Sequence, residues 1–507
     1  MVRRKKKRNQ KRISPIIVLI MIMIIVIVIS AIFSLLGMEG NITSVNNGAL
    51  ETSLVTMNNL LTPRGFKYFF SHVITNLSTF KPLFYIIISL IGIGIAEKSG
   101  LLEAIFKPFR RMKPGISTFL VLVLSILAAV LGDAGYAIMI PMSVVIYKYL
   151  NRNPMMGILT SFLGLSVGYG TSVIYNDLDY TLGSLMQTAA RVEVDRNFEF
   201  TLYSNLFITI SSMFILSFLG TIIIERFLAP KFSRKNRYEI EEHETSKKAL
   251  LFTFLSFLLL VFFIAYSLVP GLPGSGLLLD QNATTYVEQV WGSNAPFHDG
   301  FVYVFSIVLA ILGLIYGVVS KNIKSNHEYS DGLAYEFKDL GYLFVLLFIV
   351  SQVIGIIEWT HLDQIITGRL VEFLSLLEFS GLPLIILFFF IVVLLGLLVP
   401  STEAKWNFVA PLTIPLFMRS NIAPEFTMFI FKGADGLAKC LTPLNGGFII
   451  MLGFLKKYNQ EEEDITIFGT LGKMKSTIAL FFIVWLLILV GWYLVGLPLG
   501  YQVLPTL

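Results

Sequence analysis

Cysteine is almost absent from this sequence, since Cys440 is the only one among 507 residues. A single cysteine excludes an internal disulfide framework and a cysteine-ligated metal site. The five histidines stand apart from one another, without zinc-site spacing, so no metal is expected. No loop has P-loop spacing, and no HExxH or Ser/His/Asp grouping occurs. We therefore expect no cofactor, no direct use of ATP and no enzymatic activity.

Charge is also scarce, because only 14% of the residues are charged while 55% are hydrophobic and the mean hydropathy is +0.75. This composition predicts a polytopic membrane protein in contact with lipid, with a single integral membrane transport domain over 1–507. Long unbroken apolar runs such as 16–36 indicate α-helices rather than the alternating strands of a membrane barrel. The placement of the net charge of +6 gives no reason to expect a nucleic-acid partner.

The N-terminus combines basic and apolar residues in the manner of a signal peptide. Eight Lys and Arg residues between positions 3 and 12 precede about two dozen apolar ones. The apolar run is too long for a signal peptide, and no small-residue cleavage site follows it. We therefore expect this segment to be retained as the first membrane span.

Nine apolar segments are predicted to cross the membrane. They are 15–37, 82–97, 154–190, 202–225, 249–269, 301–320, 342–358, 424–455 and 476–498. Two further apolar stretches, at about 116–147 and about 381–418, are interrupted near the middle by polar residues. We interpret each as a re-entrant helical hairpin that enters and leaves on the same side.

The distribution of Lys and Arg supports this topology. Predicted cytosolic segments hold 29 of the 39 Lys and Arg residues, and the outer segments hold 7. Cytosolic loops carry an excess of these residues, so the N-terminus is predicted in the cytosol and the C-terminus outside, in the cell (inner or plasma) membrane. Lys405, Lys432 and Lys439 are the remaining three, and they fall at membrane depth.

The two predicted hairpins resemble copies of one element. Asp133-Ala134-Gly135-Tyr136 is followed by Pro141 and Pro154, and Glu403-Ala404-Lys405-Trp406 is followed by Pro411 and Pro424. The hairpins open to opposite sides, which predicts an inverted repeat with halves at 82–225 and 342–498. The segments after the hairpins also look broken, at 168–170 and at 433–447, and broken helices are typical of transporter substrate sites.

Several charged residues at membrane depth are candidates for a substrate and ion pathway. Each would cost about 2.5–3.5 kcal/mol if it faced lipid, so most must face a shared interior. The acids are Asp133, Asp177, Asp179, Glu403 and Asp435. Asp179 and Asp435 lie beside the breaks, where a carboxylate could bind a cation or relay a proton. The alternatives are helix capping near Asp133 and Glu403, and a structural salt bridge from Asp435 to Lys432 or Lys439.

Uncharged residues complete the candidate pathway. Tyr136 and Trp406 occupy matching hairpin positions and could stack on a ring-bearing substrate, or could simply pack. Lys405 could bind an anionic group or pair with Glu403. Four further residues offer hydrogen bonds at the two breaks: Ser172, Asn176, Thr442 and Asn445.

The chain resembles the AbgT family, the p-aminobenzoyl-glutamate transporters, which are also described as exporters of sulfonamide antimetabolites. The resemblance runs nearly end to end. It rests on the run GIGIAEKSGL at 92–101, Asp133-Ala134-Gly135-Tyr136, Asp179, Ala404-Lys405-Trp406 with Ala410-Pro411, Asp435, Thr442-Pro443-Leu444, Leu452-Gly453-Phe454 and the run WYLVGLP at 492–498.

This resemblance implies a homodimer with nine transmembrane helices, two re-entrant hairpins and transport coupled to protons or sodium. It implies important roles for Asp179 and Asp435, and places Trp406 and Pro443 near the substrate path. The expected function is secondary transport of p-aminobenzoyl-glutamate or related aromatic or carboxylated organic anions, including export of antimetabolites. The alternatives are a different carboxylate or peptide-like metabolite on the same scaffold, and a membrane-embedded enzyme.

The sequence departs from the family pattern at the two breaks. Ser172 stands where the family has Asn, and Lys439-Cys440 stands where it has Asn-Pro. Glu403 replaces a small residue. A fixed ammonium at Lys439 could occupy the place of a coupling cation.

Overall fold

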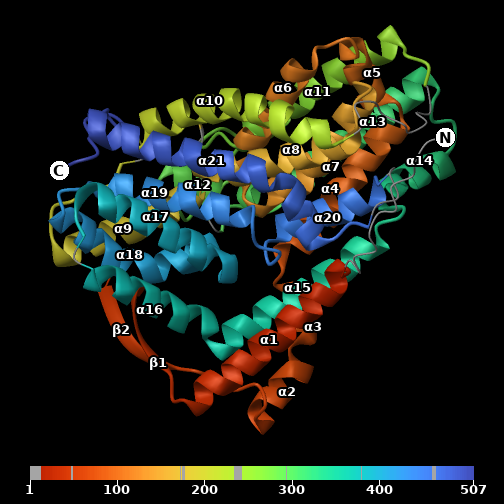
Figure 1. The fold of residues 1–507 in the computed structure, drawn as a ribbon. Helices are drawn as coiled ribbons and strands as arrows, with labels where there is room; N and C mark the ends of the chain where they lie inside the picture. The colour runs from red at the N-terminus through yellow and green to blue at the C-terminus, as the bar shows by residue number, and fades with distance from the viewer. Residues whose placement is uncertain are drawn as a thin grey trace, which may run out of the picture.

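The computed structural model describes residues 13–46, 49–171, 173, 177–201, 203–232, 243–292, 294–377, 379–459 and 464–507. Helices run through almost all of this part of the chain (Figure 1). Six helices begin with proline, which suits the first helical position because its missing N–H has no partner there. Pro154 and Pro424 are two of these, so the matching prolines of the two halves start matching helices.

The N-terminal part forms one side of the molecule. Its elements are α1 Pro15–Leu35, β1 Glu39–Asn46, β2 Ala49–Thr56, α2 Pro63–Ser71 and α3 Val73–Ser78. The strands pair antiparallel, with Glu39 opposite Thr56 and Asn46 opposite Ala49. This two-stranded sheet departs from the all-α prediction. An Asn-Gly pair, a strong hairpin signal, lies between the strands in the sequence.

The first predicted half is a series of helices with two sharp bends. It comprises α4 Lys81–Lys98, α5 Leu101–Phe106, α6 Pro114–Ala128, α7 Asp133–Tyr149, α8 Pro154–Val167, α9 Asp177–Glu193 and α10 Leu206–Ile223. The α4 helix and the segment from Leu101 to Phe109 meet at 70°. Gly100 lies at this bend with φ +82°, and Gly132 with φ +56° precedes α7. Glycine adopts such left-handed backbone without a steric penalty.

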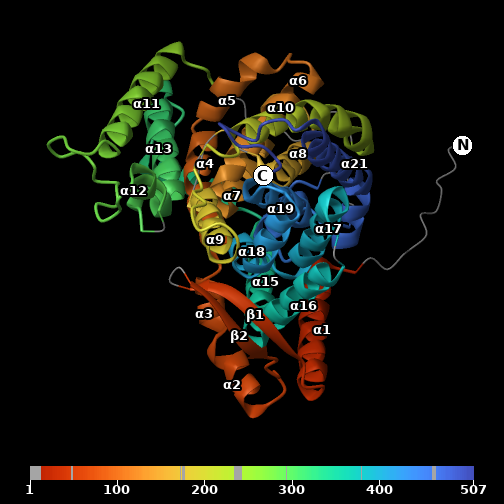
Figure 2. The same cartoon turned by 90° about the vertical axis from the view of Figure 1, so that its left-hand side faces the viewer.

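A separate lobe joins the two halves (Figure 2). It comprises α11 Lys247–Ser267, α12 Tyr286–Trp291 and α13 Pro296–Ser320, and α13 packs along α4. The next helix, α14 Asn326–Leu333, lies outside the lobe and also packs on α4. The outer face of α11 is apolar and open, with Leu259 69% and Phe262 68% exposed. Such a face is stable in lipid rather than in water.

The second predicted half repeats the order of elements in the first. It comprises α15 Gly341–Thr360, α16 Leu362–Leu376, α17 Gly381–Leu398, α18 Thr402–Arg419, α19 Pro424–Lys439, α20 Gly446–Lys457 and α21 Ile467–Val495. Each half contains an apolar helix, α6 or α17, followed by a helix with an internal proline, α7 or α18. A pair of helices separated by a break comes next, α8 and α9 in the first half and α19 and α20 in the second. This order agrees with the predicted repeat, while the re-entrant path of the hairpins stays a prediction.

Length and composition identify eight helices that could span a membrane within the described residues, or nine if the bent α4–α5 pair counts as one. Seven of the nine coincide with predicted spans. The other two are the 114–131 segment and α17, the first arms of the predicted hairpins. The predicted spans 154–190 and 424–455 are each divided into two shorter helices. Their interruptions therefore cut through the centre of the fold.

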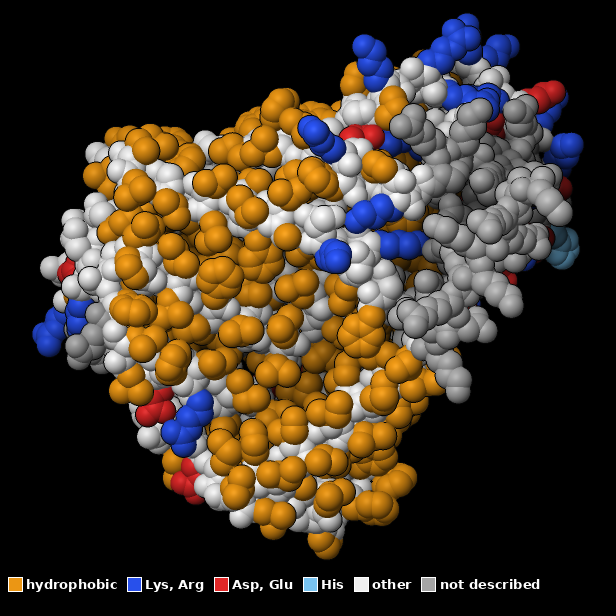
Figure 3. Space-filling model, in the orientation of Figure 1, with side chains coloured by type: hydrophobic (Ala, Val, Ile, Leu, Met, Phe, Trp, Pro, Cys, Tyr) orange, Lys and Arg blue, Asp and Glu red, His pale blue; other side chains and the backbone are white. Residues whose placement is uncertain are grey.

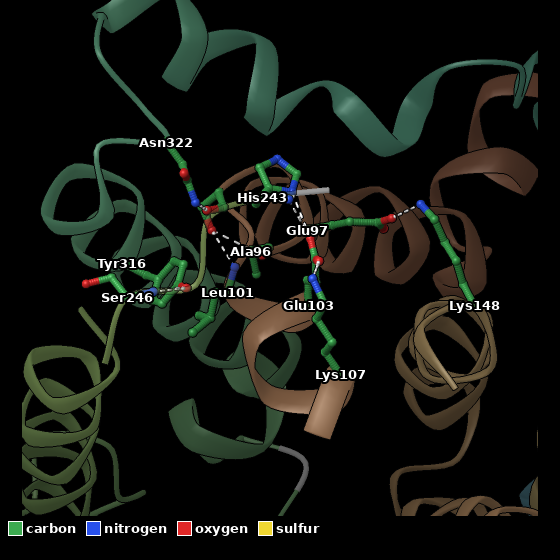
Figure 4. A network of polar contacts seen from close by, with 11 residues as sticks. Ala96, Glu97, Leu101, Glu103, Lys107, Lys148, His243, Ser246, Tyr316 and Asn322 are labelled. Carbon is green, nitrogen blue, oxygen red and sulfur yellow. Dashed lines mark hydrogen bonds and ion pairs between the residues drawn. The ribbon is translucent and has the colours of Figure 1, made fainter. Parts of the chain in front are cut away.

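Salt bridges fasten one end of the bundle. Glu97 at the end of α4 pairs with Lys148 in the last turn of α7 at 2.6 Å (Figure 4). Glu103 on α5 pairs with Lys107 at 2.8 Å and accepts a 3.0 Å hydrogen bond from the backbone N–H of His243. Both carboxylates are buried, so each needs such partners. The end of α7 distant from Gly132 is thereby fixed to α4.

The last turn of α20 is fastened at the same end. Lys457 pairs with Glu336 at 2.8 Å, and Glu336 lies in a short 3₁₀ helix, Tyr335–Phe337, that contacts α4. Burial is the largest influence on Glu336 and acts to raise its pKa, but the Lys457 ammonium, a hydrogen bond with Glu97 and the Lys148 charge together hold this pKa below its usual value. Two helices, α7 and α20, are thus anchored at one end, while the other end of α7 lies at the first hairpin tip and that of α20 at the second break.

Candidate functional site

The two broken segments cross in backbone contact at the centre of the fold. The first break follows α8 and includes the 3₁₀ turn Gly168–Gly170, and the second separates Lys439 from Gly446. A Cβ atom on Gly170 would lie 2.9 Å from the Gly433 nitrogen, and one on Gly436 would lie 2.5 Å from the Ser166 oxygen. Any side chain at these glycines would separate the two segments.

Substitution of Gly436 by alanine should therefore destabilise the protein by about 1–3 kcal/mol, because the added methyl meets the fixed Ser166 carbonyl. Gly491 in α21 is the matched control, since a Cβ there meets nothing within 4 Å. Gly491→Ala should leave stability unchanged or raise it by up to about 1 kcal/mol through helix propensity. Thermal unfolding of the detergent-solubilised variants measures both, and equal unfolding temperatures would contradict the close crossing.

Hydrogen bonds satisfy the free backbone groups at the second break. Asn445 caps α20 by accepting from the Gly447 N–H at 3.0 Å, and its amide donates to the Lys439 oxygen at 3.2 Å. Thr442 Oγ1 donates to the Leu397 oxygen at 2.8 Å. Non-helical backbone at this depth needs such partners. Thr442 and Asn445 therefore have a structural role, and Pro443 lies between them, half-buried.

Asp435 is the centre of a buried charged cluster. Its carboxylate pairs with Lys405 of α18, lies 3.7 Å from the Lys439 ammonium and accepts a 2.5 Å hydrogen bond from Thr402 Oγ1. Asp435 and Lys405 are fully buried. Lys405 thus pairs with Asp435 and not with neighbouring Glu403, and Asp435 pairs with Lys439 but not with Lys432. With both lysines charged, the cluster of Lys405, Asp435 and Lys439 carries one excess positive charge.

A second buried ion pair links the two halves. Asp179 of α9 pairs with Lys432 of α19, and both side chains are buried. Removing one member of such a pair leaves an uncompensated charge, at a cost of about 3–5 kcal/mol. Both predicted acids beside the breaks are therefore held by lysines from α18 or α19.

Lys439 lines a cavity of about 440 Å³, and its ammonium lies 4.1 Å from the centre of the Tyr169 ring, which lines the same cavity. Both hairpin tips reach this cavity, through Asp133 and through Pro400, Ser401, Thr402 and Glu403. Both breaks reach it as well, through Tyr169 and through Leu444, Asn445 and Gly446. The opposite wall comes from the start of α4 and from α15. The cavity is thus the place where the two halves meet.

A larger cavity of about 720 Å³ lies elsewhere, against α8, the 464–473 segment and the start of α21. None of the predicted site residues lines it. The smaller cavity is the candidate site, because of the two cavities only this one is lined by both hairpin tips and both breaks.

The structure also distinguishes between the alternatives that the sequence left open for the two hairpin aromatics and for the residues near the helix starts. Tyr136 is buried and hydrogen-bonds Ser166 Oγ at 2.9 Å, and Trp406 is buried and donates from Nε1 to the Leu182 oxygen at 2.9 Å. Neither lines the cavity, so the packing alternative describes both rings. Asp133 is the first residue of α7 rather than its N-cap, whereas Ser401 does cap α18.

Two predicted residues, Ser172 and Asn176, lie outside the described residues. Sequence reasoning missed Thr402 as a partner of Asp435 and Tyr169 as a partner of Lys439. Both adjoin predicted features, a hairpin tip and a Gly-Tyr-Gly break, which is the signal that could have identified them.

Comparison with known proteins connects this arrangement to transport. The family model described as the AbgT putative transporter family matches residues 7–507. The p-aminobenzoyl-glutamate transport protein of Escherichia coli (strain K12) is 26% identical over 459 residues, which cover 89% of this chain and 88% of that protein.

Two solved structures share the fold. The YdaH transporter of Alcanivorax borkumensis has 24% identity and a TM-score of 0.51, with 96% of this chain and all of that chain covered. Neisseria gonorrhoeae MtrF, described as illuminating a class of antimetabolite efflux pumps, has 25% identity and a TM-score of 0.50, and the match covers 97% of this chain and 98% of that chain.

Proposed function

The chain belongs to the AbgT family of transporters, and on this premise we propose that it is a proton-coupled secondary transporter of organic anions of the p-aminobenzoyl-glutamate class. One observation carries the proposal. A single cavity is lined by both hairpin tips and both breaks, and Lys439 is part of its wall. Transporters with internal repeats hold substrate at such a midpoint.

Anion binding follows from the charge of the cluster around Asp435. Lys405 and Lys439 place two ammonium groups beside one carboxylate in a buried site. A net charge is costly there, so a cargo carboxylate at Lys439 would balance the excess. Three carboxylates line the same cavity, those of Asp133, Glu358 and Glu403, and they would repel an anion from the other parts of its wall. The carboxylate of a cargo is therefore placed at Lys439 and not elsewhere on the wall.

Proton coupling follows from the same cluster. A sodium ion and a proton would each add one positive charge to the cluster, but a sodium ion also needs several oxygen ligands beside a carboxylate that two ammonium groups already contact. A proton needs no coordination shell. Protonation of Asp435 would weaken its hold on Lys405 and Thr402, both on α18 near the second tip. Proton binding is thereby linked to movement of a cavity wall.

The proposed orientation places the N-terminus in the cytosol and the C-terminus outside. Lys and Arg side chains gather at the end of the molecule that carries α5 and α14, beyond a wide apolar surface (Figure 3). The positive-inside rule supports assigning that end to the cytosol. We further propose a homodimer in the cell membrane, which chemical crosslinking in native membranes would test.

Flux into proteoliposomes tests the proposed function, with p-aminobenzoyl-glutamate as the first solute. An imposed pH gradient should drive its accumulation or its expulsion, and a sodium gradient at equal pH should not. Competing carboxylates and small peptides identify the preferred cargo. Flux driven by sodium alone would refute proton coupling, and product formation without any gradient would indicate an enzyme.

A further inference from the structure

A second, smaller cavity lies beside the first hairpin tip, and five of its eleven lining residues carry an aromatic ring. Its volume is about 170 Å³. The lining comes from four places: Tyr85 of α4, the tip residues Val130, Leu131, Gly132 and Ala134, Tyr169 with Leu178 near the first break, and Trp291, His298, Phe301 and Val302 of the α12–α13 lobe. We name this cavity the aromatic chamber.

The aromatic chamber adjoins the main cavity. Tyr169 and Leu178 line both spaces, so the two are separated by single side chains. The first hairpin tip also borders both, with Asp133 on the main cavity and Gly132 on the aromatic chamber. Lys439 and the lining carboxylates border only the main cavity, whereas Trp291, His298 and Phe301 border only the aromatic chamber.

Ring contacts hold the wall of the aromatic chamber in place. The Trp291 ring lies 5.5 Å from Phe297 at 68° and 6.4 Å from Phe301 at 38°, and Phe297 meets Phe301 edge-on at 5.6 Å. Such tilted and edge-on pairs are favourable. Trp291 is therefore supported by α13 before any ligand arrives.

The α12 helix is also fixed to the transport core. Thr285 and Glu288 form a capping box at its start, and Tyr180 of α9 donates a hydrogen bond to Glu288. This hydrogen bond holds the pKa of the Glu288 carboxyl below its usual value. Trp291, in the last turn of α12, thereby keeps its position relative to the first break.

The size and polarity of the aromatic chamber define its ligand. An apolar cavity of about 150 Å³ holds one benzene molecule, so about 170 Å³ suits a single six-membered ring. His298 Nδ1 is buried and makes no hydrogen bond to any described residue, the Asp299 carboxylate being 3.8 Å away. A polar substituent on the ring could use this nitrogen.

We propose that the aromatic chamber binds the single ring of an aromatic anion whose carboxylates remain in the main cavity beside Lys439. The inference rests on the proposed function and deepens it, because it assigns ring recognition to Trp291 and His298 of the connecting lobe. Cargo specificity then comes from two sites, one for charge and one for the ring.

Equilibrium binding to the full chain in lipid nanodiscs tests the proposal with three probes: p-aminobenzoyl-glutamate, p-aminobenzoate and glutamate. Trp291→Ala should weaken binding of both aromatic probes about tenfold and leave any binding of glutamate unchanged. Trp291→Phe should retain most of the affinity. Phe262→Ala, on the exposed face of α11, is the matched control and should bind all probes as the unmodified protein does.

A second variant tests the polar contact. His298→Phe should bring the affinities of p-aminobenzoyl-glutamate and benzoyl-glutamate together, because only the former has the substituent that could hydrogen-bond Nδ1. Retention of the full difference between these two ligands would refute the role of His298.

The outcomes separate the subsite from the function. Tight p-aminobenzoyl-glutamate binding that Trp291→Ala leaves intact, or weakens no more than it weakens glutamate, overturns the subsite while the proposed function stands. Trp291-dependent binding of p-aminobenzoate without binding of p-aminobenzoyl-glutamate supports the subsite and refutes the proposed cargo. Binding of none of the three probes by the unmodified protein overturns both.

Discussion

Replacement of Asp435 by asparagine should stop transport, with a fall in flux of at least about a hundredfold, or about 2.7 kcal/mol. Asparagine cannot take up the coupling proton, and it cannot neutralise Lys405 and Lys439. Flux of p-aminobenzoyl-glutamate into proteoliposomes under a pH gradient is the measurement.

Loss of flux in this variant has a second source, because the substitution leaves two ammonium groups buried without their carboxylate. Breaking such a pair costs about 3–5 kcal/mol and could unfold the chain. The double variant Asp435→Asn, Lys405→Met removes one ammonium and restores the net charge of the cluster. It should recover folding, read by thermal unfolding in detergent, but not transport.

The single variant Lys405→Met completes the comparison. It leaves Asp435 paired with Lys439 and should keep the protein folded, because it removes the excess positive charge of the cluster and leaves no buried charge without a partner. Lys405→Met should still transport, because Asp435 and its partner Thr402 remain. A folded double variant that transports as fast as an active Lys405→Met variant would refute the role of Asp435 in coupling.

The central architecture could be predicted because its signals are local. The two acid–aromatic–proline patterns correctly located matching helices, and glycine and proline located both breaks. The β1–β2 sheet was missed because an apolar membrane protein was expected to contain helices only. No functional residue was predicted between the spans 249–269 and 301–320, although this segment contributes Trp291 and His298 to a cavity.

Pairing of the buried charges could not be predicted in the same way. The cost of burial implies that Lys405 needs an acid, but it does not identify which one. Glu403 is two residues away and Asp435 is thirty, yet the helical path of α18 directs Lys405 toward α19 and leaves Glu403 on the cavity wall. The packing of Tyr136 and Trp406 could not be predicted either, because matching positions in a repeat do not imply that either side chain faces the substrate.

Replacement of Lys439 by glutamine should have the second large effect. The cargo carboxylate would lose a charged hydrogen-bond donor worth about 1.5–3 kcal/mol, so KM for p-aminobenzoyl-glutamate should rise about 10- to 100-fold. The remaining Lys405–Asp435 pair is neutral, so binding of an anion should have a smaller effect on the proton affinity of this pair. The number of protons moved per cargo, read from the pH gradient that just prevents net flux, should therefore fall.

Two further variants separate a local role of Lys439 from the general field of the cavity. Lys439→Arg keeps the charge beside Asp435 and Tyr169, so it should retain most of the affinity. Lys81→Gln removes an exposed cation from the same cavity wall, where water screens the charge, and should change KM by no more than about threefold. If Lys81→Gln and Lys439→Gln raised KM equally, anion recognition would belong to the overall potential of the cavity. An unchanged proton stoichiometry in Lys439→Gln would show that the excess charge of the cluster has no part in coupling.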